Sequence, residues 1–168
     1  QTIEEQTGLQ LTRTEDPAEL MKYRNPNTFT VDANGQVTGL NLRSNGLSDD
    51  KITFLPELTR LEALNLSEND FEQVVIPPNM MLLRFLDLSE NRRLRRVELK
   101  PKFHTLPLEW IDLNECALAS FTLPSLLLLK KLDISRNTLT ELVIQGDCPA
   151  LSMLDLSENQ LKSFELRG

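Results

Sequence analysis

The sequence predicts an α/β repeat solenoid: short parallel strands form one concave sheet, the convex side is mostly extended, and a helix and hairpin cap precedes the first repeat. Three observations predict this fold. A nine-residue pattern occurs six times, its copies are spaced by 24, 22, 25, 21 and 22 residues, and apolar and polar residues alternate inside each copy as in a strand. The chain has 168 residues, 40% of them hydrophobic, so we expect one domain with a sizeable core.

Residues 1–36 precede the first copy of the pattern and are expected to cap the sheet, because an uncovered solenoid end exposes apolar side chains and strand edges. Two helical pieces are predicted. One spans residues 2–7, and the second starts at Asp16-Pro17, where an N-cap residue is followed by proline at the first helical position. Two extended segments, residues 29–31 and 37–40, flank Ala33-Asn34-Gly35, which is typical of a β-hairpin.

The repeat array covers residues 37–168, and each copy reads Leu-x-x-Leu-x-Leu-x-x-Asn or a close variant. Residues two apart on a strand point to the same face, so the last two apolar positions of each copy are predicted to face the core. These pairs are Leu40/Leu42, Leu64/Leu66, Leu86/Leu88, Ile111/Leu113, Leu132/Ile134 and Leu154/Leu156. The closing Asn, replaced by Cys116 in the fourth copy, is expected to bond the turn backbone in a stacked ladder.

A second apolar triad follows the Asn in copies two to six and predicts short extended segments on the convex side, often closed by Pro77 or Pro124. The triads are Phe71/Val74/Ile76, Leu94/Val97/Leu99, Leu118/Phe121/Leu123, Leu139/Leu142/Ile144 and Leu161/Phe164/Leu166. The first copy differs, because apolar residues recur every three positions after Asp49-Asp50. This spacing predicts a short helix there.

This array resembles the leucine-rich repeat proteins, whose solenoids are right-handed horseshoes that present a curved surface to a protein partner. More narrowly, residues 3–11 (Ile-Glu-Glu-Gln-Thr-Gly-Leu-Gln-Leu) and Val37-Thr-Gly-Leu40 are similar to the start of the repeat domain in bacterial Roco proteins. In that family the repeats precede a GTPase module, and no GTPase residue is present here. Because the sequence stops inside a coil, we expect it to be truncated at its C-terminal end.

Composition argues against several function classes. The 18 Lys and Arg against 25 Asp and Glu give a net charge of −7, which disfavours nucleic acid as a partner. The apolar runs are far too short for a membrane span. One histidine, His104, and two cysteines, Cys116 and Cys148, leave no catalytic set and no four-ligand zinc site. We therefore expect no enzyme activity, no metal and no cofactor, and the two cysteines are expected to be unpaired.

Two columns of outward residues define the predicted concave face. The residue before each inward pair gives the first column, Gly39, Ala63, Phe85, Trp110, Lys131 and Met153, and the residue inside each pair gives the second, Asn41, Asn65, Asp87, Asp112, Asp133 and Asp155. Large apolar residues that face outward are candidate anchors for a protein partner. The predicted binding residues are Phe85, Trp110, Met153, Asp87, Asp112, Asp133, Asp155, Glu90 and Glu115. Their acidity favours a basic or amphipathic protein or peptide; alternatively, the aromatic residues only pair across strands.

A basic cluster forms a second candidate surface, a docking patch for an acidic domain of the same chain or for an anionic lipid. Its members are Arg92, Arg93, Arg95, Arg96, Lys100 and Lys102, with only Glu98 among them. The alternative is that these residues pair with acidic side chains on neighbouring coils.

Three functions remain open on this evidence. The first is a noncatalytic protein-binding scaffold, the second is a regulatory arm of a larger signalling enzyme of Roco type, and the third is a secreted or surface adhesin. The lack of a cysteine-rich cap favours the cytoplasm over a secreted or cell-surface location.

Overall fold

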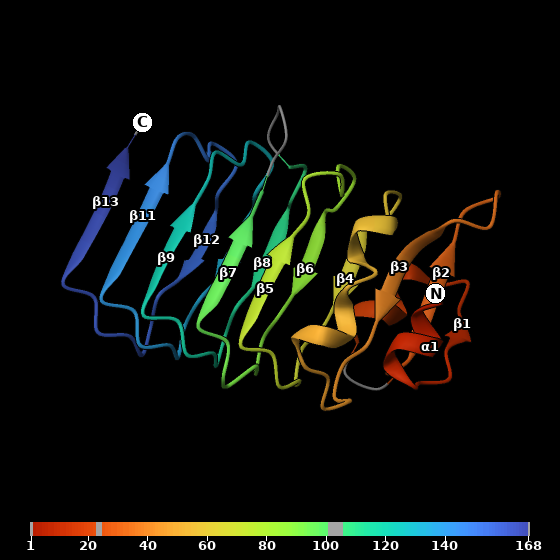
Figure 1. Ribbon diagram of the computed structural model, residues 1–168. Coiled ribbons are helices and arrows are strands. Elements are labelled where there is room, and N and C mark those ends of the chain that lie inside the picture. Colours follow the sequence, from red (N-terminus) through yellow and green to blue (C-terminus); the bar gives the residue numbers. More distant parts are fainter. Residues whose placement is uncertain (1, 23–24, 101–105, 168) are drawn as a thin grey trace.

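The computed structural model describes residues 2–22, 25–100 and 106–167, and it confirms the predicted solenoid (Figure 1). The six coils each contribute one strand to an eight-stranded sheet with the order β1-β2-β3-β4-β6-β8-β10-β12, and β1 and β2 come from the segment that precedes the first coil. The strands are β1 (Thr12–Arg13), β2 (Thr28–Val31), β3 (Val37–Asn41), β4 (Ala63–Asn65), β6 (Phe85–Asp87), β8 (Trp110–Asp112), β10 (Lys131–Asp133) and β12 (Met153–Asp155). All neighbours from β3 to β12 are parallel, and equivalent repeat positions pair with one another.

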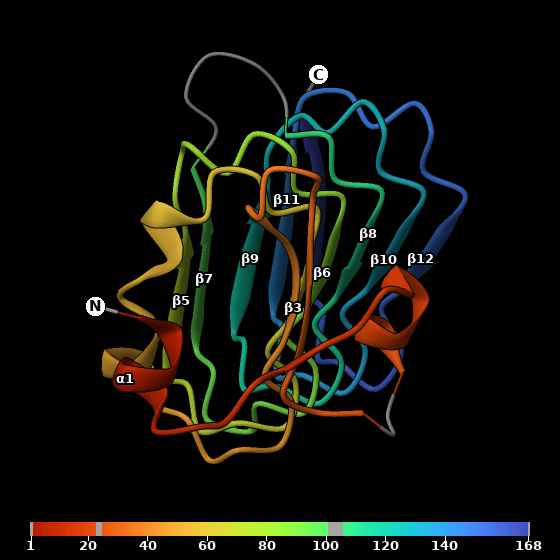
Figure 2. The ribbon, with the colours of Figure 1, turned by 90° about the vertical axis from the view of Figure 1, so that its right-hand side faces the viewer.

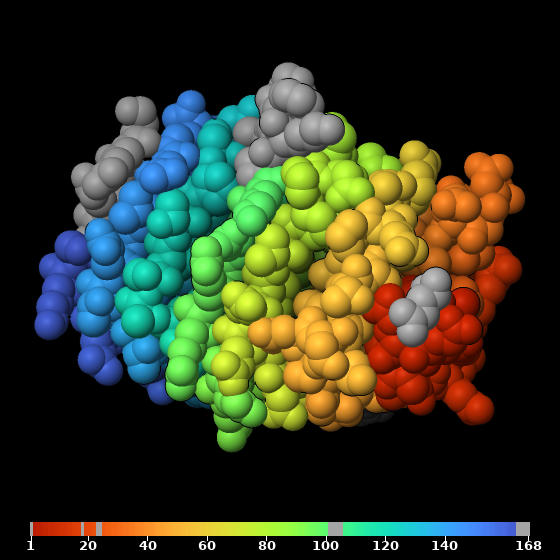
Figure 3. Space-filling view, in the orientation of Figure 1, coloured from red at the N-terminus to blue at the C-terminus, as the bar shows by residue number. Residues whose placement is uncertain are grey.

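The opposite, convex side of coils two to six is extended, as predicted. Its strands are β5 (Gln73–Ile76), β7 (Arg96–Leu99), β9 (Ser120–Leu123), β11 (Glu141–Gln145) and β13 (Ser163–Arg167). They form two sheets, β5-β7 and β9-β11-β13, and not one. In the space-filling view each of these coils lies directly against the next (Figure 3).

The helix predicted on the convex side of the first coil is two separate 3₁₀ turns, η2 (Asp49–Ile52) and η3 (Leu55–Glu57). Pro56 lies in the second turn. Its missing N–H and its ring prevent one continuous helix through this segment. The apolar residues still recur every three positions, and Ile52 and Leu55 are buried.

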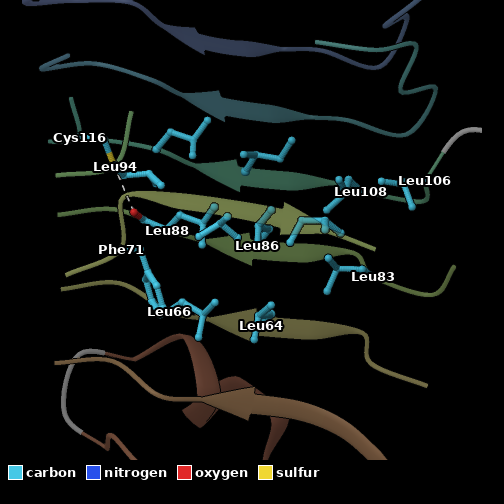
Figure 4. Packing of buried hydrophobic residues seen from close by; sticks show 14 of the residues in the cluster. Leu64, Leu66, Phe71, Leu83, Leu86, Leu88, Leu94, Leu106, Leu108 and Cys116 are labelled. Carbon is cyan, nitrogen blue, oxygen red and sulfur yellow. Dashed lines mark hydrogen bonds between the residues drawn. The ribbon is translucent and has the colours of Figure 1, made fainter. Parts of the chain in front are cut away.

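The core lies between the two sides of the stack and consists of the predicted inward residues. The inward pairs from Leu40/Leu42 to Leu132/Ile134 have essentially no exposed surface. Figure 4 shows this packing in coils two to four, where leucines of successive coils interdigitate. On β12, the last strand of the sheet, Leu154 is 36% exposed because one side of this strand has no sheet neighbour.

The predicted asparagine ladder is present. The Asn137 amide donates to the carbonyls of Leu113 in the preceding coil and of Ile134 in its own coil, at 2.8 and 3.2 Å. Asn69, Asn91 and Asn159 repeat these bonds in their own coils. The Cys116 thiol takes the same place and donates to the carbonyl of Leu88 at 3.3 Å (Figure 4) and to that of Asn114 at 3.7 Å.

The first 36 residues contact both sides of the stack. Helix α1 (Ile3–Thr7) begins at Thr2 with a capping box to Glu5 and contacts η2 on the convex side. The segment predicted to start at Asp16 is a short 3₁₀ helix, η1 (Pro17–Met21), which contacts β3 and β4 from the other side. Figure 2 shows α1 and the orange-red η1 on opposite sides of the stack. The predicted hairpin is also confirmed, because β2 and β3 pair antiparallel.

Candidate functional site: the concave face

The outward side of the eight-stranded sheet, here called the concave face, is covered at its N-terminal end by η1. Leu20 of η1 is 1% exposed and lies against Gly39. The side-chain amide of Asn65 donates to the carbonyl of Leu20 at 3.4 Å, and that of Asn41 donates to the carbonyl of Asn25 at 3.1 Å. The two smallest residues of the first outward column, Gly39 and Ala63, therefore make room for η1.

The predicted aromatic anchors lie immediately beyond η1. Phe85 and Trp110 are paired in register on β6 and β8, and both are half-buried. A cation lies over each ring: the Arg84 guanidinium is 5.3 Å from the Phe85 centroid, and the Lys131 ammonium is 5.4 Å from that of Trp110. Met153 is 55% exposed, but Lys131 separates it from Trp110 in the register. The structure thus brings two of the three predicted apolar anchors together.

A cleft of about 600 Å³ opens between η1 and the first aromatic residue. Its lining residues are Pro17, Leu20, Met21, Thr30, Thr38, Glu62, Ala63, Arg84 and Phe85. The repeat pattern does not predict this cleft, because one wall is η1, which belongs to no repeat. The signal in the sequence is the change from Gly39 and Ala63 to Phe85 and Trp110 in one column, which indicates that another segment packs on the first two strands.

The second outward column holds the turns that follow the strands. In each described coil the side-chain oxygen of this residue accepts the N–H two positions later, with distances from 2.9 to 3.2 Å. Asn41 and Asn65 make this bond in the first two coils, and aspartates make it in the other four. Asp87 and Asp133 also accept the hydroxyls of Ser89 and Ser135, both at 2.6 Å. The aspartate column therefore has a structural role as well as its charge.

Ionised carboxylates are electrostatically unfavourable in the middle of this column. Burial raises the pKa of Asp87, and burial together with the charges of Asp87 and Asp133 raises the pKa of Asp112 from 3.8 to about 6. Lys131 lies between Asp112 and Asp133, 4.0 Å from a carboxylate oxygen of each. At the end of the column the hydrogen bonds from Ser157 lower the pKa of Asp155. The cost of ionisation is thus concentrated on the strands that carry the aromatic anchors.

The acidic rim lies at the residue before each ladder position, where the backbone is left-handed in every coil, with φ between 52° and 57°. Arg136 bonds Glu115 at 2.8 Å and Glu158 at 3.0 Å, and its bond to Glu115 lowers the pKa of that carboxyl. Burial and the neighbouring charge of Glu68 instead raise the pKa of Glu90. Of the two predicted rim residues, Glu115 forms ion pairs with cations of this chain, whereas Glu90 lies mainly beside other carboxylates.

Replacing Asp112 with asparagine is expected to stabilise the fold by about 1–3 kcal/mol at pH 7. Asn41 and Asn65 show that asparagine makes the same turn bond in this column. Because the pKa of Asp112 is raised in the folded state, protonation of this carboxyl favours folding. Its contribution to the free energy of unfolding is fully present below about pH 4 and is lost as the pH rises through 6. Urea unfolding of Asp112→Asn and wild type at pH 4 and pH 7 should therefore differ only at pH 7.

Asp155→Asn is the matched control, because it changes the same repeat position where the pKa is lowered. It should not stabilise the chain at pH 7. Equal stabilisation by both variants would contradict the role of burial and like charge at Asp112.

The basic cluster is largely paired with carboxylates of this chain. Arg92 bonds Glu115 at 3.2 Å, Arg93 pairs with Glu72, and Lys100 bonds Glu98 at 2.8 Å. Arg96 also pairs with Glu98, and Lys102 lies outside the described residues. Arg95 and Arg96 line a groove of about 370 Å³ between β7 and β9. This arrangement supports the ion-pairing alternative for four of the six predicted docking residues.

The described part of the chain offers little for catalysis or metal binding. Within residues 2–22, 25–100 and 106–167 no group of three His, Cys, Asp or Glu side chains is arranged to hold a metal ion. Burial raises the pKa of the Cys116 thiol to about 12, so it is not a nucleophile at neutral pH. Cys116 and Cys148 are both free thiols, and His104 lies outside the described residues. No helix in these ranges is long and apolar enough to cross a membrane.

The chain is similar to parts of two much longer proteins. It is 39% identical over 125 residues to a Roc-COR-CHAT protease from an unknown prokaryotic organism, a match that covers 74% of this chain and 12% of that protein. It is 36% identical over 134 residues to Toll-like receptor 2 type-2 of Gallus gallus, with 74% of this chain and 16% of the receptor covered. No family model and no solved structure matches the chain. The resemblances to leucine-rich repeat proteins and to Roco-type proteins are both confirmed by these matches.

Proposed function

This chain belongs to the leucine-rich repeat proteins, and we propose that it is a noncatalytic scaffold that binds a protein or peptide on its concave face. The observation that carries the proposal is the pair Phe85 and Trp110, two adjacent, half-buried aromatic residues that point outward and are bordered by carboxylates. Neither side chain belongs to the core of buried residues. Aromatic residues of this kind are the usual energetic centre of a protein interface.

The electrostatics of the same face support a basic partner. Positions 2, 3, 5, 7 and 8 of the nine-residue pattern face outward, and over the six coils they carry ten carboxylates and five cationic side chains. This face therefore holds a net charge of −5, compared with −7 for the whole chain. Burial raises the pKa values of Asp87, Asp112 and Glu90, and the charges of neighbouring carboxylates add to the rise at Asp112 and Glu90. A partner's Arg or Lys residues would relieve this repulsion, and rim charges of this kind mainly speed association.

Trp110→Ala is expected to weaken partner binding by about thirtyfold, the effect of removing a central aromatic anchor. Peptides selected on the folded chain from a random display library serve as probes, and fluorescence anisotropy gives their Kd. Phe85→Ala should act in the same direction. The control is Leu127→Ala, since Leu127 is 46% exposed but lies outside the repeat positions of the concave face. Peptides that bind all four proteins equally would show that the concave aromatic pair is not the binding site.

The similarity to the Roc-COR-CHAT protease favours a second function, a regulatory arm of a larger Roco-type enzyme. In this proposal residues 1–36 cap the array, residues 37–168 form the arm, the protein is cytoplasmic, and an acidic domain of the same chain docks on Arg95 and Arg96. Reversal of both charges in the full-length protein should then change its catalytic activity, while Trp110→Ala should not. The similarity to a Toll-like receptor favours the remaining alternative, a secreted or surface adhesin.

A further inference from the structure

We propose that the cleft between η1 and β6 is an anchor pocket for a large apolar side chain of the partner, and that Arg or Lys residues next to this anchor lie along the aspartate column. This inference rests on the proposed concave-face function and adds the chemistry of the partner. The occupant is therefore an apolar-basic segment of another protein.

The cleft is suited to an apolar guest. Its walls are Pro17, Leu20 and Met21 from η1 and Ala63 and Phe85 from the sheet, and its volume of about 600 Å³ lies in the range of ligand pockets, about 300–1,000 Å³. Leu20 is held in place by burial and by the bond from Asn65 to its carbonyl. The pocket thus has a wall that is built before any partner arrives, which lowers the entropic cost of binding.

Three of the polar side chains that line the cleft, Thr30, Thr38 and Arg84, already have partners. The hydroxyls of Thr30 and Thr38 bond each other at 3.0 Å. Arg84 bonds Glu109 at 2.7 Å and lies over the Phe85 ring. A polar guest would find few open donors or acceptors on these groups, whereas an apolar guest buries the walls and leaves the existing bonds intact.

The aspartate column begins close to the cleft. Asp87 lies two residues beyond Phe85 on β6, about 7 Å along the strand. The column then crosses three strand intervals to Asp155, about 14 Å, which an extended segment spans with about four residues. A partner segment with one apolar anchor and basic residues within the next several positions therefore matches the spacing of the face.

The charge of the face separates this partner from other classes. A net charge of −5 on the outward repeat positions disfavours anionic lipids and nucleic acids. Lys131, in the neighbouring outward column, lies 4.0 Å from the carboxylates of Asp112 and Asp133. Cationic groups from a partner would offset the negative charge of the column, and guanidinium or ammonium groups on a flexible segment can reach it.

The test uses peptides selected from a random display library on the wild-type chain. We expect enriched peptides to share a large apolar residue followed within a few positions by Arg or Lys. Thr38→Phe narrows the cleft and should weaken these peptides by at least about tenfold. Ser152→Phe adds the same side chain at the same repeat position in the last coil, away from the cleft, and should change their affinity less than about twofold. Met21→Trp, which narrows the cleft from η1, replaces Thr38→Phe if that variant fails to fold.

The outcomes separate this inference from the function on which it rests. Peptides that lose affinity with Trp110→Ala but bind Thr38→Phe and Met21→Trp normally would overturn the anchor pocket and leave the concave-face function standing. Enriched peptides without basic residues would overturn the role of the aspartate column. No enrichment, or binding unaffected by both Trp110→Ala and the cleft variants, would overturn the concave-face function itself.

Discussion

Asn137→Ala is expected to lower the free energy of unfolding by about 3–4 kcal/mol, the largest effect of any single substitution proposed for this chain. The Asn137 amide donates to the carbonyls of Leu113, Ile134 and Ser135, and its oxygen accepts the N–H of Leu118 at 3.0 Å. Alanine leaves these backbone groups without partners in an environment where Asn137 is 6% exposed. Buried unpaired groups cost about 1–3 kcal/mol each, and the sum is reduced by local relaxation.

Cys116→Ala is the matched control, because Cys116 occupies the same ladder position and makes only weak thiol bonds there, at 3.3 and 3.7 Å. Its expected cost is about 1 kcal/mol. Urea unfolding monitored by circular dichroism measures both. Similar costs for the two variants would show that the asparagine bonds contribute little and that the ladder only fills space.

Gly39→Ala is expected to cost about 2–3 kcal/mol and to displace η1 from the concave face. A Cβ atom at residue 39 would lie 2.0 Å from Leu20 Cδ1 and 2.7 Å from Thr30 Oγ1. Leu20 is 1% exposed and Thr30 is 5% exposed, so relief of the conflict requires one of these packed side chains to turn toward the cleft that both line, or η1 to shift. Hydrogen exchange of the η1 amides should accelerate, while amides on β10 should keep their protection.

The double variant Leu20→Ala/Gly39→Ala tests the cause. Leu20→Ala alone should cost about 2–4 kcal/mol, because it leaves a cavity under η1. If the steric conflict with Leu20 is the cause, the double variant costs less than the sum of the single variants. Additive costs would instead assign the effect of Gly39→Ala to Thr30 or to the strand itself.

Much of the fold was predictable from the sequence because the residue pattern within each repeat determines which side chains face the core and where the turn lies. Leu86 and Leu88 lie two residues apart, so they enter the core together, and Asn91 follows at the turn. The positions of these residues depend only on the sequence of their own coil and on a neighbouring coil with the same pattern. The second apolar triad of each coil predicted the extended convex side of coils two to six, and the turn signal Asn34-Gly35 predicted the hairpin of β2 and β3.

The concave site was predictable only in part. Phe85 and Trp110 were expected side by side, and the register confirms this. Met153 was expected in the same group, but the strand of Lys131 separates it from Trp110. The role of the predicted residues in binding remains a prediction, and the experiments above address it.

The sequence by itself determined the period of the coils, the residues that face the core and the chemistry of the outward columns. The alternation of apolar and polar residues is visible within one copy of the pattern, and each further copy repeats it. Only the tertiary structure decided where η1 lies and that a cleft opens beside Phe85. It also decided that the convex strands form two sheets and which aspartates have raised pKa values. These features depend on contacts between segments far apart in sequence and on burial summed over several coils. A segment outside the repeat has no periodic position, and only the space left by Gly39 and Ala63 indicates where it packs.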